Sequence, residues 1–260
     1  YENNGANPPS WTERNITTSI GVSNPAAIQT FPADIDGDSD IDIIFSVNTD
    51  NRIAWYENNG ANPPSWTERN ITTSLSGVKS IYAIDINNDG YNDVVSASSI
   101  IGGSNDVLVW YENNGANPLS WTERTISSLI NHGDEVYAID INNDGYNDVI
   151  LAHALNGYVA WYENNGANPP SWTERNIAQL DGLNIYAIDI NNDGYNDVIG
   201  SSSTGFWWYE NNGANPPSWT SHQINSIGNP VTDIVATDSN NDADTDIINA
   251  LSLGTAIRLY

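Results

Sequence analysis

The chain has 260 residues, no cysteine, and 33 acidic against 7 basic side chains, which gives a formal net charge of −26 at pH 7. A charge of this sign excludes nucleic-acid binding through a basic surface, and it disfavours unaided binding to anionic membranes. No apolar stretch approaches the ~18 residues of a membrane-spanning helix, so we expect no membrane insertion. The hydrophobic fraction of 39% is sufficient for one large all-β domain.

An acidic nine-residue segment recurs five times along the chain. Three copies read Asp-Ile-Asn-Asn-Asp-Gly-Tyr-Asn-Asp and begin at Asp85, Asp140 and Asp189, and looser copies begin at Asp34 and Asp238. The copies follow one another at intervals of about 50 residues, and a fixed period of this length is typical of solenoids and propellers.

A second block recurs between the acidic segments. Its core, Trp-Tyr-Glu-Asn-Asn-Gly-Ala-Asn-Pro, begins at Trp55, Trp110, Trp161 and Trp208, and the chain starts inside a fifth copy at Tyr1. Short runs of β-branched and aromatic residues, bounded by Gly, Pro, Asn and Asp, flank both blocks and predict four strands per repeat. We therefore predict an all-β, five-bladed β-propeller with four-stranded antiparallel blades.

The two chain ends are predicted to share one blade. Strand 11–16 at the N-terminus would supply the outer strand of the last blade, which closes the ring and removes two free strand edges. A fragment of a longer array would show the same matching ends, so that alternative stays open. The predicted blades are 28–71, 80–126, 135–177, 184–224, and 231–260 completed by 11–16.

The acidic segments have the composition of cation-binding loops. Oxygen-bearing side chains at positions 1, 3, 5 and 9, with Gly at position 6, suit Ca²⁺, which takes six to eight oxygen ligands. Carboxylates ~4 Å apart repel by about 1–4 kcal/mol per pair, so three to five in one loop need a counter-ion. An isolated segment of this kind is often only a turn. Five copies in phase favour metal binding, at about five Ca²⁺ per chain.

The repeats resemble the FG-GAP/VCBS family, in the VCBS-like form common in secreted bacterial proteins. The match lies in the acidic loop at 189–197 and in segments such as Val159-Ala160-Trp161-Tyr162-Glu163-Asn164. The resemblance implies a Ca²⁺-binding propeller that is secreted or held at the cell surface, with ligands at positions 1, 3, 5 and 9 and the carbonyl at position 7. Applied to the five loops, these positions and the acidic residues beside them are Asp34, Asp36, Asp38, Asp40, Asp42, Asp85, Asn87, Asp89, Tyr91, Asp93, Asp140, Asn142, Asp144, Tyr146, Asp148, Asp189, Asn191, Asp193, Tyr195, Asp197, Asp238, Asn240, Asp242, Asp244 and Asp246. Position 6 departs from Gly in the first and last loops, where it is Ser39 and Ala243.

The aromatic and histidine residues have simpler interpretations. Nine of the ten tryptophans occupy two repeat positions, which favours packing between blades over sugar stacking. Phe206-Trp207 departs from the repeat and is expected to be more exposed. His132 and His153 share no repeat position, so we expect structural or solvated roles. The Thr-Glu-Arg triplets of the outer strands are interpreted as solvated surface pairs.

The acidic residues outside the repeats are too few to indicate catalysis. They are Asp50, Asp106, Asp134, Glu135, Asp181 and Asp233. A glycosidase would need two of them to converge, and the sequence contains no nucleophile elbow, zinc-protease or phosphate-loop motif. We expect a non-enzymatic, secreted binding or adhesion module for a glycan or an extracellular protein. A self-associating repeat unit of an extracellular fibre or surface layer is the alternative, and a carbohydrate-active enzyme is the second alternative.

The two faces of the predicted ring differ in how much they vary between repeats. The acidic loops and Asn-Pro blocks share one face and are nearly identical. The opposite face carries connections that differ in every blade, at 17–27, 72–80, 127–135, 178–184 and 225–230. Recognition usually uses varied loops on a rigid frame, so we expect a specific partner on this opposite face. If the repeated loops bind the partner instead, one equivalent site per blade is expected.

Overall fold

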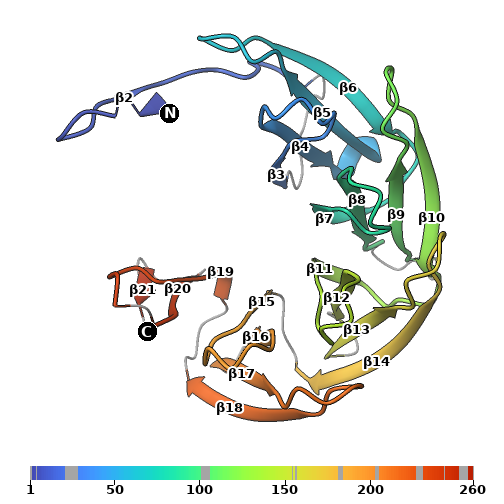
Figure 1. Ribbon diagram of the computed structural model, residues 1–260, viewed down its shortest axis with the longest axis vertical. Coiled ribbons are helices and arrows are strands. Elements are labelled where there is room, and N and C mark those ends of the chain that lie inside the picture. The colour runs from blue at the N-terminus through green and yellow to red at the C-terminus, as the bar shows by residue number, and fades with distance from the viewer. Residues whose placement is uncertain are drawn as a thin grey trace.

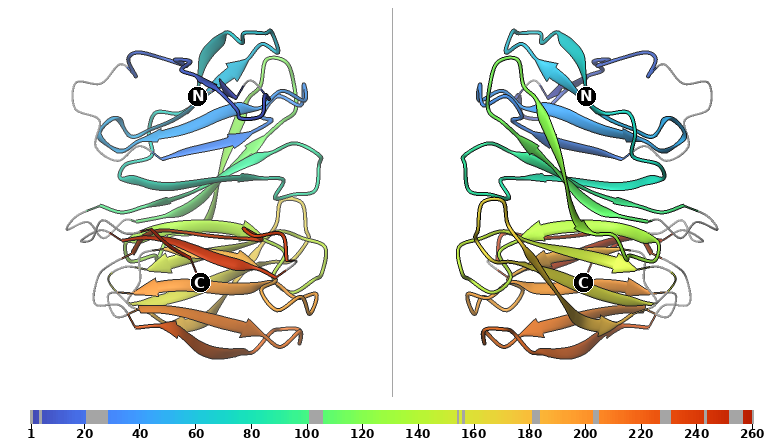
Figure 2. Two further views of the ribbon diagram at one scale, coloured as in Figure 1. Left: turned by 90° about the vertical axis from the view of Figure 1, so that its left-hand side faces the viewer. Right: turned by 90° about the vertical axis from the view of Figure 1, so that its right-hand side faces the viewer.

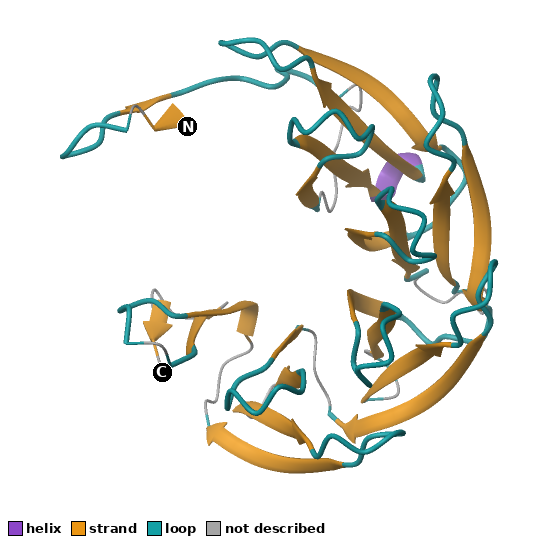
Figure 3. Ribbon diagram, in the orientation of Figure 1, coloured by secondary structure: helices purple, strands orange, loops and turns teal. Residues whose placement is uncertain are grey.

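A computed structural model of the chain describes residues 2–3, 5–20, 29–100, 106–153, 155, 157–180, 184–202, 205–226, 231–242, 244–251 and 257–259. Apart from one 3-10 turn, η1 (Asn48–Asp50), its regular elements are strands (Figure 3). The described residues contain no helix with the length and apolarity needed to cross a membrane.

Four sheets are four-stranded antiparallel meanders, each built from consecutive strands. The first sheet contains β3 (Thr30–Ala33), β4 (Asp42–Val47), β5 (Arg52–Asn58) and β6 (Trp66–Thr72). The second contains β7 (Val78–Ile84), β8 (Asp93–Ser98), β9 (Leu108–Asn113) and β10 (Trp121–Ser127). The third sheet contains β11 (Gly133–Ile139), β12 (Asp148–His153), β13 (Tyr158–Asn164) and β14 (Trp172–Gln179). The fourth contains β15 (Ile185–Ile188), β16 (Asp197–Ser202), β17 (Gly205–Asn211) and β18 (Trp219–Asn225).

The sheets are arranged like the blades of a propeller. Figure 1 shows the first strand of each sheet nearest the central axis and the fourth strand at the rim. A fifth sheet has three strands within the described residues, β19 (Val231–Thr237), β20 (Asp246–Leu251) and β21 (Ile257–Leu259). The all-β propeller architecture predicted from the repeats is therefore present.

Burial along the strands explains why these sequences form blades. The second strands β8, β12 and β16 are buried at all six positions because neighbouring sheets cover both of their faces. The outer strand β6 is exposed at most positions, as its polar Thr-Glu-Arg-Asn sequence requires. The hydrophobic core consequently lies between sheets: one cluster joins Ile44 and Trp55 of the first sheet to Val78 and Val94 of the second.

Ring closure is not shown by this structure. The N-terminal strands β1 (Glu2–Asn3) and β2 (Trp11–Thr12) form a two-stranded ribbon of their own. In Figure 1 this ribbon lies apart from β19–β21. Of the predicted outer strand 11–16, only Trp11 and Thr12 form a strand, and within the described residues they pair with β1 and not with the last blade.

The innermost strands are joined around the axis by side chains at one repeat position. Gln29 accepts the backbone N–H of Ile81 in the next sheet, and Ser80 accepts that of Val136 at 3.1 Å. Glu135 continues the series and accepts the N–H of Ile185 at 2.7 Å. Aromatic rings form a second series beside these bonds, with centroids 4.6–5.2 Å apart: Phe31, Tyr82, Tyr137 and Tyr186.

Candidate functional site

The acidic loops connect the first and second strands of each sheet and fold through side chain to backbone hydrogen bonds. In the second loop the Asp85 carboxylate accepts the N–H groups of Asp89, at 3.1 Å, and of Gly90, at 2.8 Å. Asn87 Oδ1 accepts the same Asp89 N–H, and Asp89 Oδ1 accepts that of Tyr91 at 3.0 Å. These bonds turn the carboxylate and amide groups inward, and the loops at 140–148 and 189–197 repeat them.

Two positions of the acidic loops adopt left-handed backbone wherever the structure describes them. Position 6 has φ near +90° at the three glycines and +75° at Ser39, so the serine adopts the conformation of the glycine it replaces. Position 4 has φ between +56° and +64° in the four copies where it is asparagine, a residue that tolerates this region. The asparagine at position 4 therefore serves the backbone, a role that the sequence interpretation did not assign.

The aspartate at position 9 ties each loop to the third strand of its sheet. Asp93 is fully buried, and its two oxygens accept the N–H groups of Ile86, at 3.0 Å, and Asn113, at 2.7 Å. Burial is the main cause that raises the pKa of this carboxyl to about 7, and it raises that of the equivalent Asp148 to about 8. Each oxygen retains a second lone pair, so these buried carboxylates can still take a cation ligand role, which would lower their pKa.

The first loop brings its carboxylates closest together. Oxygens of Asp34, Asp36 and Asp42 lie within 4.8 Å of one another. Burial raises the pKa of Asp36, followed by the charges of Asp38 and Glu57. The donor set is therefore all oxygen, densely charged and short of counter-charge, which fits a hard cation such as Ca²⁺.

The other predicted ligands lie in the corresponding places of their loops. In the last loop Asp238 and Asn240 accept the N–H of Asp242, and Asp246 accepts that of Ser239. Position 6 of this loop, Ala243, lies outside the described residues. At position 7, Tyr91, Tyr146 and Tyr195 place their rings against a glycine of the hairpin that joins the third and fourth strands: Gly115, Gly166 and Gly213.

Asparagine side chains connect each loop to the next sheet, and sequence reasoning missed them. Asn147, at position 8 of the loop that begins at Asp140, donates its Nδ2 hydrogen to the carbonyl of Asp85 in the preceding loop at 2.7 Å. Asn164, the last residue of Tyr-Glu-Asn, is buried and donates to the carbonyl of Ile86 at 2.9 Å. Equivalent bonds join the first sheet to the second and the third to the fourth. The signal available was an Asn that recurs in every copy of Tyr-Glu-Asn and at position 8 of the three middle loops, which no ligand role explains.

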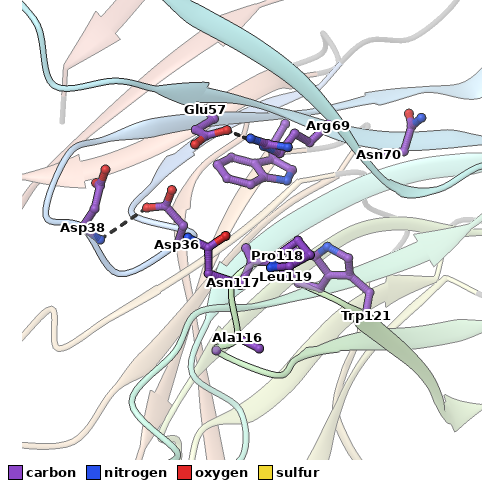
Figure 4. A pocket seen from close by; sticks show the side chains of 12 residues that line it. Asp36, Asp38, Glu57, Arg69, Asn70, Ala116, Asn117, Pro118, Leu119 and Trp121 are labelled. Atoms are coloured by element: carbon purple, nitrogen blue, oxygen red, sulfur yellow. Dashed lines mark hydrogen bonds and ion pairs between the residues drawn. The ribbon is translucent and has the colours of Figure 1, made fainter.

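A cavity of about 340 Å³ lies where the first acidic loop faces the hairpin of the second sheet. Figure 4 shows Asp36, Asp38 and Glu57 on one side of it, with Leu119 and Trp121 on the other. Its lining residues are Asp36, Asp38, Trp55, Glu57, Arg69, Asn70, Gly115, Ala116, Asn117, Pro118, Leu119 and Trp121. Figure 2 shows the hairpins of neighbouring sheets projecting at one face of the molecule. We refer to this space as the loop cavity.

The charged residues of the outer strands form defined pairs. Arg69 pairs with Glu57 across the sheet, and Arg124 pairs with Glu112 at 2.6 Å. The glutamate of Thr-Glu-Arg accepts instead from a tyrosine hydroxyl, as Glu123 does from Tyr111 at 3.0 Å. The triplet lies on the exposed outer strand as interpreted, but its glutamate and arginine do not pair with each other. The arginine and the glutamate reach two different partners on the third strand, and the first pair borders the loop cavity.

Trp55, Trp110 and Trp161 pack between sheets as predicted and are each 1% exposed, whereas Trp11 of the N-terminal ribbon is 59% exposed and does not. The expectation of greater exposure was wrong for Phe206, which is fully buried, whereas Trp207 is half-buried. His153 is also fully buried.

The acidic residues outside the repeats meet different partners. Burial, helped by the charges of Asp233 and Asp134, raises the pKa of Glu135 to about 7. Asp134 pairs with Lys79 at 3.2 Å, and Asp106 accepts the N–H of His132. Asp181 lies outside the described residues, as do large parts of the varied loops on which we expected a partner to bind.

Comparison with known proteins identifies the repeat. FG-GAP-like repeats match residues 34–96, 85–151, 140–200 and 189–248. The chain belongs to the FG-GAP-like repeat family. No curated protein matches the sequence.

Two solved structures resemble this FG-GAP-like chain. One is an Agrocybe aegerita lectin that specifically recognises non-reducing terminal N-acetylglucosamine; it is 17% identical, has a TM-score of 0.64, and the match covers 95% of this chain and 67% of the lectin. The other is the V. cholerae biofilm matrix protein Bap1, 17% identical with a TM-score of 0.44, where the match covers 86% of this chain and 34% of Bap1. At this identity the lectin supports the fold alone.

Proposed function

We propose that this FG-GAP-like protein is a Ca²⁺-stabilised, non-enzymatic binding module that acts outside the cell and takes glycans as partners. The loop cavity is the observation that supports the proposal. It combines two indole rings, a Glu57–Arg69 ion pair and two loop carboxylates around one space. Aromatic faces together with a few oriented polar groups are the usual lining of ligand sites. The lectin among the structural neighbours adds an analogy of fold, not of site.

Calcium would have a structural role in this proposal. The residues that would hold it are the side chains at positions 1, 3, 5 and 9 of each loop, together with the carbonyl at position 7. Bound Ca²⁺ would supply positive charge to loops whose carboxylates otherwise repel one another. Because Asp36 and Asp38 also border the loop cavity, the cation would fix one wall of the proposed glycan site.

A glycan array probed in Ca²⁺ and again in excess chelator tests the binding function. We expect defined glycans to be retained in Ca²⁺ and lost in chelator. Glu57→Gln should weaken binding because it removes a carboxylate that lines the cavity. Glu2→Gln is the matched control, since Glu2 makes the equivalent pair with Arg14 in the N-terminal ribbon, away from the cavity. Absence of any retained glycan, or equal effects of the two substitutions, would refute the proposed role.

We also propose that the ring closes through the N-terminal ribbon. The pairing of β1 with β2, Glu2 opposite Thr12, repeats that of β5 with β6, Glu57 opposite Thr67. Trp11 of the ribbon is 59% exposed. Its repeat equivalents, by contrast, pack against the neighbouring sheet. Docking the ribbon on β21 would bury this indole and complete the fifth blade.

Closure can be tested with one cysteine pair. Leu259 of β21 is the repeat equivalent of Trp55 of β5, because it pairs with Ile248 as Trp55 pairs with Ile44. Trp55 pairs with Arg69, and the repeat equivalent of Arg69 is Arg14. Arg14→Cys combined with Leu259→Cys should therefore form a disulfide within one chain. A disulfide between chains would favour assembly into a fibre or layer, and persistent free thiols under oxidising conditions would contradict closure.

A further inference from the structure

A second cavity, of about 350 Å³, lies at the rim between the third and fourth sheets. Ile177, Ala178 and Gln179 of β14 form one wall, and Trp207, Tyr209, Trp219 and Ser221 of β17 and β18 form the other. None of these seven side chains is charged, in contrast to the acidic loop cavity. We refer to this space as the rim cavity.

Three departures from the repeat create the rim cavity. In the first two sheets the tyrosine of Trp-Tyr-Glu meets a glutamate of the fourth strand, as Tyr56 meets Glu68 at 2.8 Å and Tyr111 meets Glu123 at 3.0 Å. In the third sheet the equivalent Tyr162 meets His153 at 3.4 Å. At Tyr209 the residue opposite is Ser221, whose side chain is too short to replace that carboxylate. The preceding sheet contributes Ala178 where its equivalents elsewhere are Thr72 and Ser127.

The third departure supplies an aromatic surface. Trp207 stands where the other sheets have Ala54, Val109 and Ala160. It is half-buried and packs against the core cluster between the third and fourth sheets, and so does Trp219. The rim cavity therefore has two indole rings on one wall.

These changes leave the Tyr209 hydroxyl without the carboxylate partner that Tyr56 and Tyr111 have. Among the described residues the Tyr209 hydroxyl makes no hydrogen bond, and burial alone raises its pKa to about 12. The indole N–H of Trp219 is buried without a partner in the described part of the chain, and so is that of its repeat equivalent Trp172, which does not line this cavity. Buried polar groups normally have partners, and each exception needs an explanation. A bound ligand with hydroxyl groups would supply those partners.

We propose that the rim cavity binds one ring of a neutral saccharide, which stacks on Trp207 and exchanges hydrogen bonds with Tyr209 and Trp219. The cavity volume falls within the ~300–1,000 Å³ range of ligand sites. The uncharged lining selects a neutral ring, because a charged group would be desolvated there without a counter-charge. The inference rests on the proposed glycan-binding function and adds to it a single, non-repeated site.

Saturation-transfer NMR and titration of the full chain with the methyl glycosides of glucose, galactose and N-acetylglucosamine test the proposal. We expect at least one glycoside to bind, and Trp207→Ala to weaken it by roughly tenfold, the value of one lost stacking contact. Ala178→Ser with Ser221→Glu should also abolish binding, because it restores the repeat's partners for Tyr209 and narrows the cavity. All three replacements occur at the same positions in other sheets, so we expect the variants to fold, with some loss of stability in Trp207→Ala because this indole packs against the core. Glu57→Gln serves as the control at the loop cavity.

Each outcome is decisive for one of the two proposals. Binding that is lost with Trp207→Ala and kept with Glu57→Gln supports the rim site. Binding that survives both rim variants overturns this inference and leaves the proposed function standing. Absence of binding by every glycoside, together with an empty glycan array, refutes both. Binding of phenol without any glycoside identifies the rim cavity as an apolar site and overturns the saccharide assignment.

Discussion

Substitution of Gly166 by alanine should destabilise the protein more than substitution of Gly145 by alanine, although both sites have left-handed backbone. Gly166 has φ +69°, and a Cβ built on it would fall well inside 3.0 Å of the Tyr146 ring. Gly145 has φ +89° and nothing within 4 Å of the corresponding Cβ. The pair therefore separates backbone strain from the contact between the hairpin and the acidic loop.

The expected free energies follow from these two contributions. A left-handed alanine costs about 1–2 kcal/mol, and both variants carry that cost. In Gly166→Ala the Tyr146 ring must also move by about 1 Å to reach ordinary contact distance. Overpacking of this kind costs about 1–3 kcal/mol. Gly145→Ala should thus lose about 1–2 kcal/mol, and Gly166→Ala about 2–5 kcal/mol.

Urea unfolding in excess chelator measures both losses without a contribution from metal. The midpoints should shift with unchanged slopes, because neither substitution alters the surface exposed on unfolding. Combining Gly166→Ala with Tyr146→Ala should cost less than the sum of the single changes, because the overlap disappears with the ring. Equal losses for the two glycine variants, or full additivity in the double variant, would show that the hairpin does not hold the loop through this tyrosine.

Further predictions concern metal and pH. At ~10 mM Ca²⁺ and dissociation constants of roughly 10⁻⁴–10⁻³ M, each occupied loop adds about 1.4–2.7 kcal/mol, so chelation should lower the melting temperature markedly; an unchanged melting curve would contradict calcium binding. Burial lowers the pKa of His153 from 6.5 to about 4, so the unfolded chain binds the proton first and up to about 3 kcal/mol of stability is lost as pH falls from 6.5 to 4. Burial raises the pKa of Glu135 from 4.5 to about 7, so up to about 3 kcal/mol is lost as pH rises through that interval. The buried Asp93 and Asp148 also titrate near this range, so each group is assigned from its own variant: Glu135→Gln should stabilise the protein above pH 7, and His153→Phe should flatten the loss below pH 6.5. Denaturant midpoints measured across this pH range check both, and parallel profiles for variant and parent would refute the assigned ionisations.

The sequence was sufficient for the features that depend on local pattern. Strand boundaries follow from short runs of β-branched and aromatic residues between Gly, Pro and Asn. The loop geometry follows from Asp and Asn side chains that bond to backbone groups two to five residues away. The packing role of Trp55 and its equivalents follows from their constant repeat position.

Features that depend on pairs distant in the sequence could not be predicted. Asn164 and Ile86 are 78 residues apart, and nothing in either segment indicates that an amide reaches that carbonyl. The rim cavity arises only where Ala178 of one sheet faces Tyr209 of the next, so each departure looks incidental by itself. The opposite face, on which we expected a partner to bind, stays a prediction because much of it lies outside the described residues.

The asparagine bonds between sheets also imply an uneven resistance to hydrogen exchange along the chain. Loops beginning at Asp34, Asp85 and Asp140 each receive an amide from position 8 of the following loop. For the loop that begins at Asp189, position 8 of the following loop is Thr245. For the loop that begins at Asp238, the equivalent residue in a closed ring would be Ile41. Neither side chain has an amide to donate. Local opening requires fewer broken contacts there, so deuterium should enter the backbone of 189–197 and 238–246 before it enters the three earlier loops.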